Sequence, residues 1–355
     1  MKELNPEKVK SQSTYKTDGK FYALCVNESK RLLYAGSSDY SVHVLDSSGE
    51  QKEVLDRWKK HENYVTALTY ISREDKQHIV SGSYDHQFIW WDPDTGAAQH
   101  CIEAHLGWVR DLTYIPSSHQ IVSSGDDMVV RLWDASTGQP IRDMKGHETR
   151  TPQNHVTALY VVAVSTDGKF IASGDRIGEV RIWETETGNL VQQFQVPVLY
   201  TYDPRQRKRS IGGIRSLAFS PDNRQIAVGG IGQVQNVDGL AGAATVELWD
   251  WNKSKQLFVA EAEGHKGIVN HLHFHTQSGW LIGAGGGSDG SFIAFWKPSD
   301  PKEMTECEDS EKTPAIQTYR VKSEGHIHRF CINSAGDRLF AAGHGKMEIW
   351  SLPIE

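Results

Sequence analysis

Three histidines that alternate along one apolar segment are the residues best placed to hold a metal. His271, His273 and His275 occupy every second position, and alternate residues of a β-strand share one face. Imidazole is the commonest metal ligand in proteins, but the sequence spells no fourth ligand beside these three. We therefore expect them to serve packing and turns, with a metal-dependent enzyme as the minor alternative.

Other patterns that carry chemistry are missing or incomplete. The chain has no Gly-x-Ser-x-Gly nucleophile motif, and its glycine-rich segments at 231–244 and 283–287 lead back into apolar strands. A phosphate-binding loop would lead into a helix, whose first amides hold the anion. The acidic segment 300–312 lacks the ligand spacing of a calcium loop. The sequence thus predicts no catalytic residue, no cofactor and no bound metal.

One loop concentrates positive charge in an otherwise acidic chain. Two tyrosines, Tyr200 and Tyr202, precede four cations in five residues, which are Arg205, Arg207, Lys208 and Arg209. Such a loop can meet an acidic or phosphorylated peptide or stack on a single-stranded nucleic acid. It can equally be a solvated surface loop. All three interpretations stay open.

The elements that position these residues repeat along the chain. Short apolar segments end in a Trp-acidic pair at 91–92, 133–134, 183–184 and 249–250, with weaker versions near 45, 296 and 350. Alternating apolar residues between Ser, Gly and Asp turns predict antiparallel strands. A period near 40–45 residues is typical of four-stranded propeller blades, and here it is lengthened by insertions. We expect an all-β fold.

The repeats resemble those of the WD40 β-propeller family, and the resemblance covers nearly the whole chain. It implies one domain at residues 11–355, a seven-bladed propeller with blades that end near 45, 91, 133, 183, 249, 296 and 350. Residues 1–10 would be an N-terminal extension. Ser11–Lys16 would supply the outer strand of the last blade, because a closed ring leaves no strand edge unpaired.

The family's hydrogen-bonded tetrad of His, Ser, Asp and Trp fits two blades by spacing. The expected members are His61, Ser81, Asp85 and Trp91 in blade two, and His105, Ser123, Asp127 and Trp133 in blade three. A buried carboxylate needs donors, which the His and Ser supply. Blade four keeps Ser173 and Trp183 but has Ile177 at the Asp position, and the spacing favours His155 over His147 as its histidine. Blade five lacks a tetrad, and blade six retains His265 and Asp289.

The resemblance also implies where partners bind. WD40 proteins often grip partners on the top face, which carries the loops from a blade's outermost strand to the next blade and from its second strand to its third. Carried over by spacing, the expected contacts are Tyr22, Tyr64, Thr66, Tyr84, Trp108, Arg110, Asp126, Tyr160, Arg176, Arg215 and Arg329. Trp, Tyr and Arg dominate the energetics of interfaces.

Composition limits the remaining function classes. The 355 residues carry a net charge of −7, which argues against a surface broadly attracted to nucleic acid or membrane. Four scattered cysteines and no secretory signal favour a reducing compartment, hence an intracellular, cytoplasmic protein, or a nuclear one in a eukaryote. We expect a non-catalytic scaffold for proteins, including acidic or phosphorylated segments, that acts as a monomer or within a hetero-complex. The alternative is a subunit of an RNA-processing or other nucleoprotein complex, in contact with nucleic acid only locally.

Overall fold

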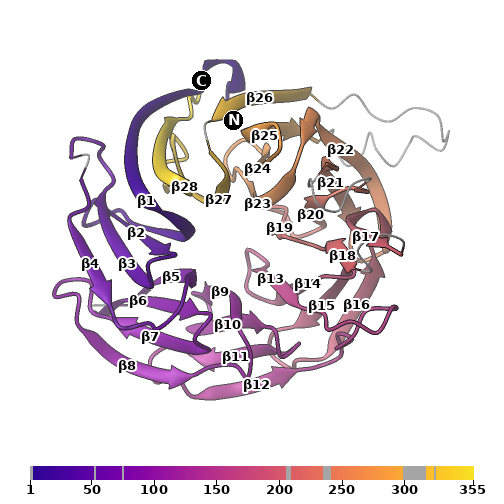
Figure 1. Cartoon of the computed structure of the whole chain (residues 1–355), viewed down its shortest axis with the longest axis horizontal. Coiled ribbons are helices and arrows are strands. Elements are labelled where there is room, and N and C mark those ends of the chain that lie inside the picture. Colours follow the sequence, from indigo (N-terminus) through magenta and orange to yellow (C-terminus); the bar gives the residue numbers. More distant parts are fainter. Residues whose placement is uncertain are drawn as a thin grey trace.

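The computed structural model describes residues 3–51, 53–73, 76–204, 209–234, 241–298, 317–323 and 325–355. Within them the chain is almost entirely β-structure, as expected, with two short 3-10 helices, η1 (Pro6–Lys8) and η2 (Pro197–Leu199). None of the described helices is long and apolar enough to cross a membrane. Figure 1 shows the sheets side by side in a ring, with β5, β9, β13, β19, β23 and β27 nearest its centre.

Five sheets of the ring have four antiparallel strands each, in sequence order from the centre outward. Blades two and three consist of β5 (Val65–Arg73), β6 (Lys76–Ser83), β7 (Gln87–Trp91) and β8 (Ala98–Glu103), then β9 (Val109–Ile115), β10 (Gln120–Gly125), β11 (Val130–Asp134) and β12 (Pro140–Met144). Blades four and five consist of β13 (Leu159–Val164), β14 (Phe170–Asp175), β15 (Glu179–Glu184) and β16 (Leu190–Gln195), then β19 (Ser216–Phe219), β20 (Gln225–Ile231), β21 (Ala243–Asp250) and β22 (Lys255–Lys266). Blade six consists of β23 (Ile268–Phe274), β24 (Leu281–Gly287), β25 (Gly290–Lys297) and β26 (Gln317–Ser323). A separate hairpin, β17 (Tyr200–Asp203) and β18 (Arg209–Gly212), precedes blade five.

The sixth sheet of the ring joins the two ends of the chain. It contains β27 (Ile327–Ile332), β28 (Arg338–Ser351), β1 (Lys10–Asn27), β2 (Leu32–Ser37), β3 (Ser41–Asp46) and β4 (Asp56–Lys59). The first part of β1 pairs with β28, from Lys10 opposite Ser351 to Lys16 opposite Lys346. Its last part pairs with β2, from Phe21 opposite Ser37 onward.

Seven separate sheets were expected, and the structure has six in the ring. The strands assigned to the last and the first blade form one six-stranded sheet, because β1 runs through both without a break. A register shift between Lys16 and Lys20 marks the point where β1 leaves one partner for the other. The predicted strand Ser11–Lys16 lies inside β1 and pairs with β28.

Apolar side chains fill the space between neighbouring sheets. Phe88 and Trp90 of β7 pack against Val109 and Trp133 of the next blade. The indole Nε1 of Trp90 donates to the carbonyl of Ala135 across the same contact, at 2.9 Å. A buried indole N–H needs such a partner, so this bond fixes how the two blades pack.

Residues 3–9 pack onto the ring instead of extending from it. Leu4 and Val9 are buried in the same apolar cluster as Trp280, Phe295 and Leu352. Leu4 also forms an isolated bridge with Ile354. The two described ends of the chain are therefore held together beside blade six.

Candidate partner-binding pocket

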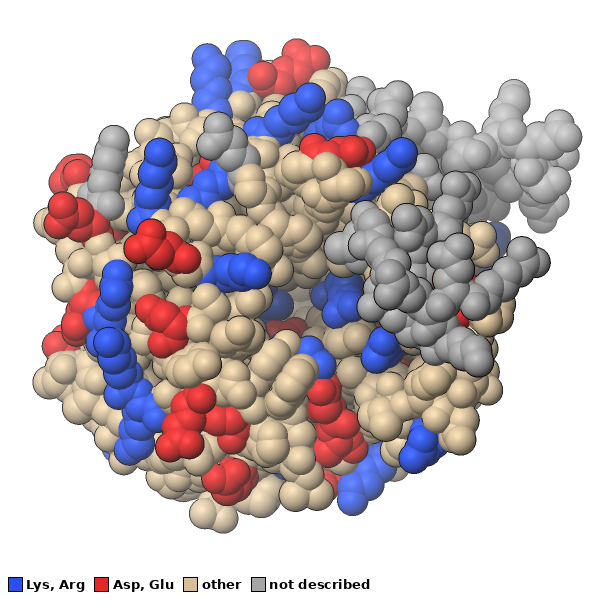
Figure 2. All heavy atoms as spheres, viewed as in Figure 1, with Lys and Arg blue, Asp and Glu red and all other residues tan. Residues whose placement is uncertain are grey.

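A small cavity of about 140 Å³ lies on the top face at the centre of the ring. Its wall consists of Tyr22, Thr66, Tyr84, Arg110, Asp111, Tyr160, Arg215, Asn270, His328 and Arg329. Figure 2 shows this face hollowed at its centre, with basic side chains gathered around the hollow. We call this cavity the central pocket.

Irregularities of the innermost strands aim side chains at the central pocket. In six of these strands the register against the neighbouring strand skips one residue, and the skipped residues are Tyr22, Thr66, Arg110, Tyr160, Asn270 and His328. A β-bulge of this kind re-aims a side chain that would otherwise lie on one face of the sheet. Arg215, directly before β19, is the lining residue from blade five. The pocket thus receives one such residue from each repeat unit.

Arg110 is held rigidly and its charge is already neutralised. Its Nε and Nη2 donate to the two carboxylate oxygens of Asp126 at 2.6 and 2.8 Å, and its Nη1 donates to the hydroxyl of Tyr84 at 2.7 Å. The guanidinium also lies 5.0 Å from the ring centres of both Tyr84 and Trp108. A bidentate ion pair together with two aromatic rings at cation–π distance fixes a guanidinium in place. We therefore assign Arg110 and Asp126 to shaping the wall.

Arg329 is paired with a buried carboxylate. Its Nη2 lies 3.3 Å from Oδ1 of Asp111, which is buried and also accepts the backbone N–H groups of Leu112 and Val162. Burial raises the pKa of Asp111, and the charge of Arg329 works against that rise. This pair closes the floor of the central pocket with no net charge.

Arg215 is the lining cation without a counter-charge. Its guanidinium lies 3.8 Å from the ring centre of Tyr160, and its buried Nε has no hydrogen-bond partner. Within the described part of the chain no carboxylate forms an ion pair with it. The charges of Arg110, Arg215 and Arg329 exceed those of Asp111 and Asp126 by one positive charge. Because Arg110 and Arg329 are paired with the two carboxylates, this charge resides on Arg215.

Aromatic side chains continue from the pocket wall across the top face. Successive ring centres are 5.8 Å apart from Tyr40 to Tyr64, 6.0 Å from Tyr64 to Tyr84, and 4.2 Å from Tyr84 to Trp108. Tyr40, Tyr64 and Trp108 are exposed, and Leu106 beside them is 90% exposed. We call Tyr40, Tyr64, Tyr84 and Trp108 the aromatic arc.

The predicted contact residues divide into three groups. Tyr84, Arg110, Tyr160, Arg215 and Arg329 line the central pocket, together with the expected Tyr22 and Thr66. Tyr64, Trp108 and Asp126 lie beside it, whereas Arg176 donates to the carbonyl of Ser210 at 3.0 Å and is occupied there. Arg205, Arg207 and Lys208 lie outside the described residues, as does the side chain of Arg209.

Sequence reasoning missed three lining residues, Asp111, Asn270 and His328. Two of them occupy the same position in the repeat as the predicted Thr66 and Arg110. The residue after the apolar anchor of the innermost strand is Asn270 in blade six and His328 in the last blade. The spacing predicted no contact from blade six, and in the last blade it predicted Arg329, one residue after His328.

Comparison with known families agrees with this architecture. The family model described as "WD domain, G-beta repeat" matches residues 52–92, 96–134, 138–184 and 256–296. The chain therefore contains WD40 repeats. These four segments correspond to blades two, three and four and to blade six.

Curated WD40 relatives match over most of this chain. The "Nuclear distribution protein PAC1" of Arthroderma benhamiae is 24% identical over 298 residues, which are 78% of this chain and 59% of that protein. The "Nuclear distribution protein nudF" of Aspergillus niger is 22% identical over 70% of this chain and 52% of its own length. The "Ribosome biogenesis protein WDR12 homolog" of Ixodes scapularis is 37% identical over 119 residues, 32% of this chain and 25% of that protein. This WD40 chain therefore spans less than two thirds of each of these relatives.

The tetrad residues of blades two and three are hydrogen-bonded to one another. The Nδ1 of His61 lies 2.7 Å from Asp85, its Nε2 lies 2.6 Å from Ser81, and the indole of Trp91 donates to that hydroxyl at 2.7 Å. In blade three the corresponding distances from His105 to Asp127 and Ser123, and from Trp133 to Ser123, are 2.9, 2.7 and 2.9 Å. These histidines have both ring nitrogens occupied. They act as structural bridges between the turn and the strand.

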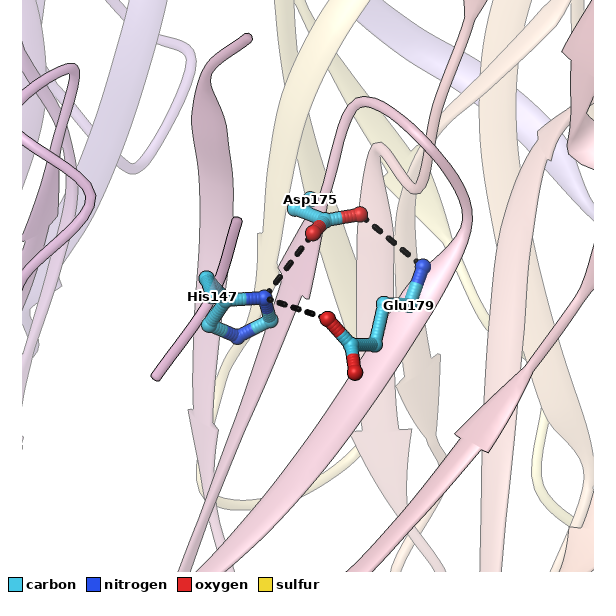
Figure 3. A group of neighbouring side chains, drawn as sticks. All are labelled: His147, Asp175 and Glu179. Carbon is cyan, nitrogen blue, oxygen red and sulfur yellow. Dashed lines mark hydrogen bonds and ion pairs between the residues drawn. The ribbon is translucent and has the colours of Figure 1, made fainter. Parts of the chain in front are cut away.

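The tetrad of blade four differs from the prediction. Its histidine is His147 and not His155, and its carboxylate is Asp175, two residues before the expected position at Ile177. Figure 3 shows the Nδ1 of His147 between Asp175, at 2.9 Å, and Glu179, at 3.6 Å. The Nε2 of His147 lies 2.8 Å from Ser173, which also accepts the indole of Trp183. The carboxylate of Asp175, at the end of β14, therefore takes the place expected for a carboxylate two residues later. A prediction from fixed spacing misses this residue.

His147, Asp175 and Glu179 are also the one group of three potential metal ligands found among the described residues. Burial opposes a charge on His147, but the two carboxylates outweigh it and raise the pKa of His147 above its ordinary value. The 2.9 Å contact from Nδ1 to Asp175 has the length of a hydrogen bond. These distances fit a proton held on the imidazole, so we assign the group to structure.

The alternating histidines do not converge. His275 has both ring nitrogens engaged, with Ser278 Oγ at 2.7 Å and the carbonyl of Gly336 at 2.8 Å. The ring of His271 packs edge-on against Phe330, with 4.5 Å between ring centres. Blade six forms no complete tetrad within the described residues, since the Nε2 of His265 meets the carbonyl of Gly290, and the carboxylate of Asp289 accepts the backbone N–H of Lys266.

Proposed function

We propose that this WD40 protein is a non-catalytic scaffold that binds partner proteins through its top face, alone or as a subunit of a larger complex. The geometry of the central pocket and the aromatic arc supports this role, because both lie on one face. The pocket offers the Nε of Arg215, which is unpaired among the described residues, and the arc offers exposed aromatic rings. Relatives named as nuclear distribution proteins are consistent with it. We further propose that the protein acts inside the cell, which the free Cys25, Cys101 and Cys331 support.

The ligand proposed for the central pocket is an anionic side chain, either a carboxylate or a phosphorylated residue. The observation that carries this proposal is Arg215, a partly buried guanidinium whose Nε is unpaired and which has no counter-charge among the described residues. Leaving a buried donor unpaired costs about 1–3 kcal/mol, and an anionic acceptor would remove that cost. Pairing an anion with a guanidinium gives a charge-assisted hydrogen bond, which is stronger than a neutral one.

The residues that flank the anionic group are proposed to be apolar. The aromatic arc leads directly from the pocket wall, since Tyr84 belongs to both. Exposed aromatic rings and Leu106 can cover aliphatic or aromatic side chains and so exclude water from the charged contact. The proposed target is therefore a segment with an acidic or phosphorylated residue next to apolar residues.

A pull-down from cell lysate with Arg215→Gln tests the proposal. Arg224→Gln is the matched control, because Arg224 is exposed in a loop between β19 and β20. We expect Arg215→Gln, but not Arg224→Gln, to lose captured proteins at least about tenfold. Free peptides with phosphoserine or glutamate should release the same proteins from wild type. Partners retained equally by all three proteins would contradict the proposal.

A second candidate function is a subunit of a nucleoprotein complex. The similarity to a relative named as a ribosome biogenesis protein favours it, and the cations at 205–209 would supply the nucleic-acid contact. Binding of single-stranded RNA that weakens with salt and disappears after charge reversal of the four cations would support this function. Equal RNA binding by the charge-reversed protein would exclude this loop as the contact.

We also propose that the ring works as seven blade units, with the six-stranded sheet acting as two of them. The support is the central pocket, which draws one bulged or equivalent residue from each of seven innermost segments. In this proposal the first part of β1 is the outer strand of the last unit, and its last part is the inner strand of the first.

A further inference from the structure

Three imidazoles form a compact cluster on one side of the central pocket. His326 directly precedes β27, His328 lies on it, and His344 lies within β28. Their ring centres are 4.9 Å apart for His326 and His328, 4.8 Å for His328 and His344, and 5.2 Å for His326 and His344. His328 lines the pocket, and its ring lies 4.9 Å from that of Tyr22.

Hydrogen bonding fixes one member of this cluster as neutral. The Nδ2 of Asn270 donates to the carbonyl of Ile327 at 2.7 Å. Because a carbonyl oxygen can only accept, this bond shows that the nitrogen and not the oxygen of the amide faces the cluster. The same Nδ2 lies 2.7 Å from the Nε2 of His326. An amide nitrogen can only donate, so Nε2 of His326 accepts and carries no proton.

The groups that face His328 are predominantly cationic. His326 directly precedes β27 and Arg329 lies on it, His344 faces His328 from β28, and Lys20 and Tyr22 face it from β1. Arg215 approaches from blade five, and Asn270 and His271 lie on β23. Asp111 of β9 is the acidic group in the pocket wall, and Arg329 already occupies it.

This environment keeps the cluster uncharged when the pocket is empty. Burial and the neighbouring cations hold the pKa of His328 well below its ordinary value and lower that of His326 to about 4. The Nε2 of His328 is buried, and no described residue forms a hydrogen bond with it. His328 therefore has a ring nitrogen that can take up a proton once a negative charge arrives.

We propose that the anionic group bound in the central pocket is bound together with a proton on His328, so that acidification strengthens binding. This inference rests on the proposed function, because it takes the anion to lie beside Arg215. A bound anion offsets the repulsion from Arg215 and Lys20, and an imidazolium N–H can then donate to it. His328 would thus act as a second, pH-dependent donor that selects for ligands arriving under mildly acidic conditions.

The direction of the effect follows from linkage. If the bound anion raises the affinity of His328 for a proton, then a proton on His328 raises the affinity for the anion by the same factor. Binding then strengthens as pH falls through the pKa that His328 has in the complex, which the anion raises above its depressed value in the empty pocket. Each unit by which the anion raises the pKa of His328 gives up to about a tenfold gain in affinity.

Calorimetric titration of the full chain with two simple anions tests the proposal. Sulfate represents a phosphoryl group and acetate represents a carboxylate side chain, and sulfate keeps its charge throughout the range used. We expect wild type to bind at least one of them roughly threefold more tightly at about pH 5.5 than at about pH 7.5. His328→Phe, which keeps a ring against Tyr22, should bind with little pH dependence. His100→Phe, at an exposed position on β8, should behave as wild type.

The outcomes separate this inference from the proposed function. Binding that is lost in Arg215→Gln but independent of pH in wild type would overturn the proton uptake and leave the anion site standing. No binding of either anion at any pH would overturn both. If His328→Phe does not fold, the histidine NMR signals of wild type decide, because the His328 resonance must titrate at higher pH with the anion than without it.

Discussion

Replacing Asp175 by alanine is expected to destabilise the protein strongly, although the family spacing does not point to this residue. Asp175 is completely buried. It accepts the Nδ1 of His147 at 2.9 Å and the backbone N–H groups of Ile177 and Glu179 at 3.0 and 2.9 Å. Removing one member of a buried ion pair costs about 3–5 kcal/mol. We expect the free energy of unfolding to fall by about this amount.

The size of the loss should depend on pH, since His147 is the charged partner. The carboxylates raise the pKa of His147 above its ordinary value of 6.5. A raised histidine pKa contributes stability that is fully present below 6.5 and is lost as pH rises through the folded-state value. The difference between wild type and Asp175→Ala should therefore be larger at about pH 6 than at about pH 9.

Urea unfolding at these two pH values, followed by tryptophan fluorescence and circular dichroism, measures the effect. Ile177→Ala is the matched control, because Ile177 occupies the position where fixed spacing places the carboxylate. Ile177 is only partly buried, so its truncation should cost less than that of Asp175. An Asp175→Ala protein as stable as wild type, or less affected than Ile177→Ala, would refute the assignment.

Three further predictions concern the ring and its top face. Acidification from pH 6.5 towards 4 should lower the free energy of unfolding. The pKa values of His326 and His328 are depressed in the folded protein, so the unfolded chain binds more protons over this range. A free energy of unfolding that does not change between these pH values would contradict the buried, neutral cluster. Leu4→Ala should cost about 2–5 kcal/mol in urea unfolding, as Leu4 is buried, whereas Leu106→Ala should leave stability unchanged; equal stabilities would show that residues 3–9 are not part of the core. Trp108→Ala should weaken partner capture without changing the thermal midpoint, and a large drop in that midpoint would instead assign the aromatic arc to the core.

Much of the architecture could be predicted from the sequence, because propeller strands repeat their turn and anchor residues. The tetrads of blades two and three follow from the spacing of His61, Asp85, His105 and Asp127, and the structure joins these residues by hydrogen bonds. In blade four, spacing predicted the wrong histidine and the wrong position for the carboxylate. A hydrogen bond requires two atoms to be close in space, and residues at different positions along the chain can meet this requirement. Asp175 ends β14 and Ile177 lies in the turn that follows it, and a carboxylate at either position can lie near the imidazole.

The candidate site was predictable in part for a related reason. Residues that follow the apolar anchor of an innermost strand line the pocket, and this position in the repeat identified Arg110, Tyr160 and Arg215. The sequence does not reveal which arginine lacks a counter-charge, because that depends on Asp126 and Asp111, whose partners come from the three-dimensional packing. The continuity of β1 through two predicted blades has the same origin, since strand pairing and not composition decides where one sheet ends.

The central claim is that Arg215 is the unpaired cation that receives an anion in the central pocket. Its most direct test is an NMR titration with sulfate that follows the Nε–Hε signals of the arginine side chains, with Arg215 assigned through Arg215→Gln. The account predicts that the Arg215 signal shifts to saturation, while those of Arg110, paired with Asp126, and of the exposed Arg224 change little. An Arg215 signal that stays in place, or that moves no more than the signal of Arg224, would contradict it.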